Sequence, residues 1–447
     1  MQESLMAELA KKDMDRKRRY QEHLDFYNGL QWTRRTKREK QLTFNYAKVF
    51  IDKITSYLMA DAVFAVDPLT NSEADFQAAE AAEKAINQVV VDNNLEELDF
   101  ATETDAAILG DGCYKVTWDT LQKRVRITAP DVQGVYAWWQ PDDPSVVYQV
   151  ASRYKLAPAL SGGPDNWITE VWTDNTFELY TNEVRTLARK NPYGFIPYII
   201  YPNLRQPKQF WGLSDIPDIS ETQRELNRAL TQVSTILELS GNPIAVLENI
   251  ESAEDIAVQP GAVWEIPEKA KAYLLDLLTG GGVALHIQYV ELLYRILHDT
   301  SESPKAAYGR ADRDLSGVAL EIELQPLLQK VRRKRLIRTT VYRRRSFMIL
   351  RLLKIFTGAD LTRVEPRMTW GTVLPQDRAR IVGNETALVQ AGIHSRRRAM
   401  DELGVENPEA EMNIWLAERE SILKQNQSYS VKVKGTSESA ATSPSAQ

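Results

Sequence analysis

A dense run of cations in the C-terminal half most constrains what this sequence can fold into. From Val331 to Arg351 there are nine Lys or Arg residues and no acid, although the whole chain carries a formal net charge of -6. A local basic band in an acidic protein indicates either contact with a polyanion or subunits that pack acid against base.

Composition bounds the class of protein. With 447 residues, 43% of them hydrophobic, the chain is long enough for two or three globular modules. Its one cysteine, Cys113, excludes an internal disulfide and a cysteine-based zinc site, and we expect it to be buried. The N-terminus lacks the apolar core of a secretion signal, and the longest apolar run, Phe347–Phe356, is half of the ~20 residues that span a bilayer. We therefore expect a soluble protein without membrane contact.

In the N-terminal half, the sequence pattern changes from helix-like to strand-like at Gly112. Before it, apolar spacing predicts helices in the first thirty residues, with Gly29 as a stop, and in 45–60. The stretch 73–111, rich in Ala and Glu and without proline, also reads as helical. After it, short aromatic and β-branched runs broken by Pro, Gly, Asp and Asn predict antiparallel strands and hairpins up to Asn203. This order of elements predicts an α+β fold.

Helix returns in the C-terminal half. The pattern predicts helices over 213–240 and 283–300, separated by a compact segment with two strand-like pieces, "IAVLEN" and "AVWEIP". For the first helix, both Ser220 as N-cap and Pro217 in the first turn are possible starts. Further along, Pro326 predicts a kink or break in the long basic helix. A strand-like run then precedes two or three short helices broken at Gly392 and at 404–408, and the polar tail 425–447 is expected to be disordered.

The motifs of catalysis are missing. The four histidines show no metal-ligand spacing, and Gly280–Gly282 is not followed by the Gly-Lys-Ser/Thr of a phosphate-binding loop. Asp111-Gly112 reads as a hairpin turn and has no serine nucleophile beside it. We therefore expect neither an enzyme nor a bound cofactor or metal.

The basic helix allows two interpretations. Its cations spread around more than one helical face, which argues against a single DNA-reading stripe, and half or more of them could pair with acids of neighbouring subunits. No groove-reading motif is present, so any DNA contact is expected to be to phosphate and independent of sequence.

Several motifs, in order, resemble the portal (head-to-tail connector) proteins of tailed bacteriophages, most closely those of long-tailed siphophages. The resemblance covers roughly residues 24–424. It rests on "LDFYNGLQW" with "NYAKVFIDKITSYLMA", on the Gly-x-Ile-Pro strand and Gly-x-Ser-Asp turn of "NPYGFIPYIIYPNLRQPKQFWGLSDIPDISETQRELNRALTQ", and on the Ser-Gly-x-Ala-Leu of "SESPKAAYGRADRDLSGVALEIELQPLLQK".

This resemblance implies a phage portal fold. It would comprise a wing, a two-helix stem, a small α/β clip, a tunnel loop with a long kinked helix, and a short helical crown. The implied boundaries are 1–212 for the N-terminal wing, 213–240 for stem helix 1, 241–282 for the clip, 283–300 for stem helix 2, 301–315 for the tunnel loop, 316–376 for the kinked wing helix and wing strand, 377–424 for the crown, and 425–447 for the tail. The crown is short for the family, and the loop is nearly neutral.

The resemblance also implies roles for particular residues. DNA contact in the tunnel loop would come from Lys305, Tyr308, Arg310 and Arg313. Stem lining or subunit packing would involve Arg224, Arg228, His286 and Arg295. A basic belt or subunit contact would involve Arg332, Arg333, Lys334, Arg335, Arg338, Arg343, Arg344 and Arg345.

The implied function is a ring-shaped channel at one capsid vertex, made in the host bacterial cytoplasm and built into the virion. Double-stranded DNA would be packaged and ejected through it without sequence specificity. Implied partners are eleven further copies in a twelve-fold ring, the terminase large subunit, a head-completion (adaptor) protein, and the major capsid and scaffolding proteins. The main rival is a monomeric or dimeric, sequence-independent nucleic-acid-binding protein that uses residues 331–351, and a second is an enzyme whose site gathers scattered carboxylates.

Overall fold

The computed structural model describes residues 5–33, 40–60, 62–70, 72–156, 166–241, 245–248, 271–274, 282–309, 317–371, 378–405, 408 and 411–424. The chain divides into two units, Met1–Val373 and Leu374–Gln447. Helices and antiparallel sheets are both present in the first unit, which confirms the predicted α+β class.

Helices dominate the N-terminal part, as predicted, but with two additional breaks. Asp13 (φ 59°) separates the first two helices, and Asn94 (φ 47°) divides the stretch that we expected to be one helix over 73–111. Gly29 (φ 88°) follows the second helix and confirms the predicted stop, since glycine tolerates this left-handed region best. The helices are α1 (Leu5–Lys11), α2 (Met14–Tyr27), α3 (Tyr46–Leu58), α4 (Glu73–Asp92) and α5 (Leu95–Leu109).

Two antiparallel sheets follow, which confirms the predicted strands. One has the order β3-β2-β9, with β2 (Asp111–Asp119), β3 (Arg124–Thr128) and β9 (Tyr198–Pro202). The other is a five-stranded meander of β4 (Val135–Trp139), β5 (Val147–Leu156), β6 (Asn166–Trp172), β7 (Thr176–Thr181) and β8 (Val184–Lys190), with the short η1 (Val132–Gly134) before it.

Two details of these sheets differ from the prediction. Asp111 and Gly112 open strand β2 and are not a hairpin turn, because Gly110 (φ 110°) already ends α5. Strand β8 had no signal in the sequence, because it is an exposed edge strand rich in Arg and Lys.

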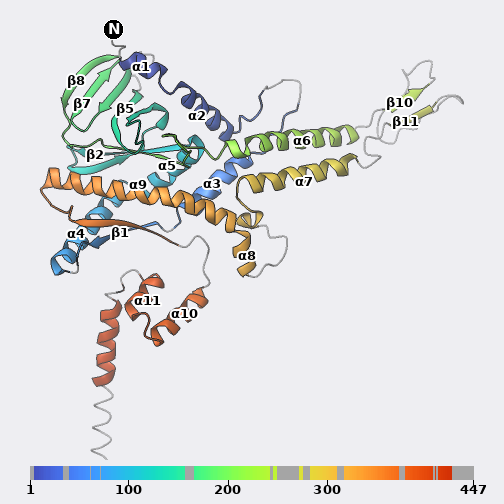
Figure 1. Cartoon of the computed structure of the whole chain (residues 1–447). Helices are drawn as coiled ribbons and strands as arrows, with labels where there is room; N and C mark the ends of the chain where they lie inside the picture. The colour runs from blue at the N-terminus through green and yellow to red at the C-terminus, as the bar shows by residue number, and fades with distance from the viewer. Residues whose placement is uncertain are drawn as a thin grey trace, which may run out of the picture. The chain divides into compact units, whose positions relative to one another are not determined.

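Two long helices lie side by side next (Figure 1), α6 (Pro217–Gly241) and α7 (Gly282–Thr300). Helix α6 begins at Pro217, so of the two predicted starts the proline is the correct one. Between the helices in sequence, β10 (Ala245–Glu248) falls in "IAVLEN" and pairs with β11 (Lys271–Leu274), a strand that the sequence did not announce. The other strand-like piece, "AVWEIP", lies outside the described residues.

The basic helix is the longest element of the chain. After η2 (Lys305–Tyr308) and α8 (Gly317–Glu323), α9 runs from Gln325 to Thr357, with Pro326 in its first turn, so the predicted break is confirmed. Strand β12 (Val364–Trp370) follows and pairs antiparallel with β1 (Ala62–Pro68). This pairing joins segments that are far apart in sequence, and β1 itself was not predicted.

The second unit is helical, as the sequence predicted for this stretch. It contains α10 (Arg378–Gln390), α11 (Arg396–Glu402) and a helical stretch over 411–424, with breaks at Gly392 and Gly404. The guanidinium groups of Arg396 and Arg419 lie 4.2 and 5.2 Å from the centre of the Trp415 ring. In the described part of the chain, no helix is long and apolar enough to cross a membrane.

The turn before α6 comes very close to the end of α5. A Cβ atom added at Gly212 would overlap the carbonyl oxygen of Gly110 and the backbone of Pro202. Because both obstacles are main-chain atoms, only glycine fits here without a shift of the backbone.

We therefore expect Gly212→Ala to lower the free energy of unfolding by about 1–3 kcal/mol, the usual range for overpacking. Chemical unfolding followed by circular dichroism measures this change. The matched control is Gly383→Ala in α10, where the added methyl group meets open space. An equal loss of stability in both variants would contradict the close approach at Gly212.

Candidate functional site: the basic helix and the loop before it

Several basic side chains of helix α9 are buried in the interior of the chain. Lys330, Lys334, Arg338 and Arg345 are 2, 1, 0 and 1% exposed. Their spacing of four, four and seven residues places them on one face of the helix. Buried cations need partners, and each of these four has a carboxylate of the same chain.

Asp215, in the turn before α6, pairs with two of these cations. Its Oδ1 lies 3.1 Å from the Lys330 ammonium group, and its Oδ2 accepts a hydrogen bond from Lys334. Lys334 also donates to the Asn203 side chain (2.9 Å), and Lys330 to the Ser301 carbonyl (3.1 Å). One carboxylate thus connects α9 to the start of α6 and, through Lys330, to the end of α7.

In this cluster, burial and the neighbouring opposite charges shift each pKa in opposite directions. Burial alone would raise the pKa of Asp215, but the two adjacent ammonium groups lower that pKa well below its usual range. Burial lowers the pKa of Lys334 to about 8, against the attraction of Asp215, with Lys330 and Arg338 adding repulsion. The cluster therefore stays ionised only because its charges compensate one another.

Arg338 and Arg345 each use several donors at once. Arg338 donates to Glu103 Oε2 (2.8 Å) and to the Asn203 carbonyl (2.6 Å). Arg345 donates to both oxygens of Asp99, at 2.5 and 2.7 Å, and its guanidinium lies 4.8 Å from the centre of the Tyr114 ring. Such two-pronged geometry is specific to arginine. Because Asp99 and Glu103 are one turn apart on α5, the two pairs fix α9 against that helix.

Arg335 has a structural role at the end of α3. Its guanidinium donates to the carbonyl oxygens of Tyr57, Leu58 and Ala60, at 3.1–3.2 Å, and to Gly371 at 2.8 Å. The last carbonyls of a helix have no partner within it, and a cation placed there satisfies them.

These contacts reduce the number of residues that could form the predicted basic belt. Of its eight members, Lys334, Arg338 and Arg345 are buried inside the chain, where they meet neither DNA nor another subunit. Arg335 is half-buried. The remaining four are exposed: Arg333 pairs with Glu302 (2.6 Å) and Arg343 with Glu365 (2.7 Å), and Arg332 and Arg344 also face outward. Contact of these four with another subunit stays a prediction.

The Gly-x-Ser-Asp turn, Gly212–Asp215, has a role for each polar group. Ser214 donates through Oγ to the carbonyl of Ile108 (2.5 Å), and the Asp215 amide donates to Ala107 (2.9 Å), so the turn caps the end of α5. The Gly212 amide donates to Asp111 (2.8 Å). This motif is therefore the junction that α5, α6 and α9 share.

Asp111 is a second buried carboxylate at this junction. It accepts hydrogen bonds from the Tyr20 hydroxyl (2.5 Å) and from the Gly212 amide. Burial raises its pKa to about 6 in spite of these bonds and of the nearby Arg16.

A cluster of amides holds the N-terminal motifs to α6. Asn227 accepts from the Phe44 amide (2.9 Å) and donates to Gln31 Oε1 (2.7 Å), while Gln31 donates to Asn45 Oδ1 (2.8 Å), the N-cap of α3. The motifs "LDFYNGLQW" and "NYAKVF" thus meet the Asn-bearing helix in space.

Only the first part of the predicted tunnel loop can be described. Tyr308 packs edge-on against Phe50 and His298, and its hydroxyl is 2.8 Å from Ser303 Oγ. The Lys305 ammonium lies 5.3 Å from the centre of the Tyr294 ring. Both residues anchor the base of the loop to α3 and α7. Arg310 and Arg313 lie outside the described residues.

The four predicted residues of the helix pair do not form one cluster. Arg224 stacks on Phe26 (5.1 Å), Arg228 pairs with Glu225 (2.7 Å), Arg295 is exposed and His286 is half-buried. A link between the two helices that we had not predicted joins the Tyr289 hydroxyl to Glu225 (3.3 Å).

The comparison with protein families covers nearly the whole chain. The family described as "Phage portal protein, SPP1 Gp6-like" matches residues 7–425. No curated protein matches the chain. The chain belongs to the SPP1 Gp6-like family of phage portal proteins.

Membership confirms the resemblance seen in the sequence and makes this portal protein a structural head-to-tail connector of a bacteriophage capsid. The family is structural and not catalytic, and it implies a ring-forming oligomer that interacts with DNA and with phage head and tail proteins. Within the described ranges, no group of three or more His, Cys, Asp or Glu side chains could hold a metal ion.

For this portal protein, Asp215→Asn should lower the free energy of unfolding by about 3–5 kcal/mol, because two buried ammonium groups lose their counter-charge. Chemical unfolding measures the loss. The matched control, Glu221→Gln, changes an exposed acid one turn into α6 and should be neutral. Equal stability of the two variants would refute the role of Asp215.

Asp111 gives a pH-dependent prediction. With its pKa raised to about 6, the folded chain holds a proton that the unfolded chain has released, so ionisation costs stability as pH rises. Relative to wild type, Asp111→Asn should therefore gain about 1 kcal/mol of stability between pH 5 and pH 7.5. Thermal unfolding at both pH values tests this. Asp119→Asn, at the half-buried far end of the same strand, should show no such trend, because the pKa of Asp119 is lowered and this carboxylate is ionised at both pH values.

Proposed function

We propose that the chain forms a ring-shaped channel at one vertex of the capsid, through which double-stranded DNA is packaged and later ejected. The observation that carries this proposal is the family match over residues 7–425. The ring would also be the docking platform for the terminase motor and for the head-completion and tail proteins.

The arrangement of elements supports a layout along the chain. Helices α6 and α7 would be the stem, with 241–282 between them as the clip. Residues 301–315 would be the tunnel loop, 316–376 the kinked wing helix and wing strand, and 377–424 the crown. The side-by-side packing of α6 and α7 and the break before Pro326 favour this assignment.

The rival function, DNA binding by a monomer through 331–351, is disfavoured by burial. Three of the nine cations in that band pair with carboxylates inside the chain and are not accessible to phosphate. Of those that remain exposed, Arg333 and Arg343 already pair with Glu302 and Glu365 of the same chain.

Electron micrographs of the purified protein, with the mass measured by light scattering, test the channel directly. We expect rings with a central hole and about twelve subunits, formed alone or after co-expression with capsid and scaffolding proteins. A uniform small species under both conditions would contradict the proposal.

The tunnel-loop assignment has its own test. Reversal of charge by Arg310→Glu with Arg313→Glu should change the packaging yield or the length of packaged DNA, because DNA would pass beside these side chains. The control is Arg185→Glu on the exposed edge strand β8. Packaging equal to wild type in both variants would remove DNA contact from the loop.

A further inference from the structure

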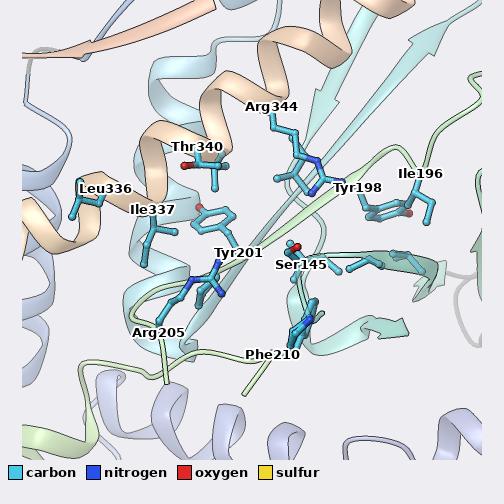
Figure 2. Close-up of a pocket in the computed structure, with 17 residues that line it drawn as sticks. Ser145, Ile196, Tyr198, Tyr201, Arg205, Phe210, Leu336, Ile337, Thr340 and Arg344 are labelled. Carbon is cyan, nitrogen blue, oxygen red and sulfur yellow. The ribbon is translucent and has the colours of Figure 1, made fainter. Parts of the chain in front are cut away.

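A pocket of about 320 Å³ lies between α9, β9 and the segment that joins β4 to β5 (Figure 2). Its walls are mostly apolar, with contributions from Val150, Ile199, Phe210 and Ile337. No Asp or Glu is among the 17 residues that line it. At this volume the pocket is at the small end of binding sites and has room for a large side chain.

Two arginines give the pocket its charge. Arg344 reaches it from α9, and Arg205 reaches it from the segment after β9 (Figure 2). Both side chains are exposed at the surface of the chain, and among the described residues no carboxylate lies within ion-pair distance of either. Burial of part of the Arg344 side chain lowers its pKa, and the more distant Asp174 compensates for this only in part. The contrast with Arg338 and Arg345 on the same helix is clear, because those side chains have partners within the chain. The pocket therefore suits an apolar group that has carboxylates beside it.

The surface of the same chain carries a group with this chemistry. Phe76 on α4 is 50% exposed, and Glu73 and Glu80 lie on the same side of the helix, one turn before and one turn after it. Each carboxylate would have one guanidinium to face. Phe76 is not among the residues that line the pocket of its own chain, so the contact requires a second copy.

We infer that Phe76 of one portal subunit enters the pocket beneath α9 of the next, with Glu73 and Glu80 facing Arg205 and Arg344. The contact joins two different patches, as a closed head-to-tail ring requires. A buried aromatic anchor surrounded by charge pairs is typical of the residues that dominate binding energy. This inference rests on the ring of the proposed function.

An exchange of charge tests the contact in the full chain. Arg205→Glu with Arg344→Glu should abolish rings in micrographs and lower the mass measured by light scattering, because like charges then face each other. Glu73→Arg with Glu80→Arg should do the same. Combined in one chain, the four substitutions should restore the rings. All four substituted positions are exposed, and circular dichroism checks that each variant is folded.

Two further variants sharpen the test. Phe76→Ala should weaken association by about tenfold or more, since it removes the anchor from the pocket. The control, Arg126→Glu with Lys190→Glu, makes the same change of charge outside the pocket and should leave the rings intact.

The outcomes separate this contact from the proposed function. The contact is wrong if both charge-reversal variants still form rings, or if the combined variant forms none while the wild-type chain does. Either result leaves the channel of the proposed function unaffected. A wild-type chain that forms no ring even with capsid and scaffolding proteins present would overturn both.

Discussion

The pairing of Asp215 with Lys330 and Lys334 is the buried interaction on which the contact between α6 and α9 depends. Asp215 compensates these two buried ammonium groups of α9, while its own amide caps the end of α5. Its neighbour Ser214 caps the same helix, and Pro217 starts α6 directly afterwards. The four residues 214–217 thereby cap the end of α5, start α6 and hold the buried cations of α9.

The buried pairs of α9 define its register more than they add stability. A buried ion pair gains little over apolar packing, because both charges must leave water. A shift of α9 by one turn, however, would leave Asp99, Glu103 and Asp215 facing the wrong side chains, with a large penalty for every buried charge left alone. The forked bonds of Arg338 and Arg345 sharpen this selection, since they need both the position and the orientation of the acid.

Local signals in the sequence were sufficient where one residue or a short period decides the outcome. Gly29, Pro217 and Pro326 mark the ends and starts of helices as their backbone chemistry requires. Pairings over long distances were beyond such reasoning, as β1 with β12 illustrates: the pattern of one strand says nothing about a partner so far along the chain. Most residues of the loop that follows α7 could be assigned only through the family resemblance.

The basic helix shows why the candidate site was only partly predictable. A run of arginines is usually a solvated face, and the sequence gives no direct sign of which cations turn inward. The available signal was the spacing of Lys330, Lys334 and Arg338, together with acids four residues apart, Asp99 and Glu103, on an otherwise apolar face of α5. For Phe76 with Glu73 and Glu80, by contrast, the residue spacing alone gives no sign of a contact surface. The exposure of Phe76 in the structure is what indicates one.

The inward pairing on α9 also changes the charge that the surroundings meet. The interior cluster holds four cations against three carboxylates, so the rest of the molecule is more acidic than the formal net charge of -6 suggests. At physiological salt, the field of this acidic exterior is screened within a Debye length of about 8 Å. The basic band thus holds the subunit together from within through its buried cations, while Arg332, Arg333, Arg343 and Arg344 keep part of it at the surface.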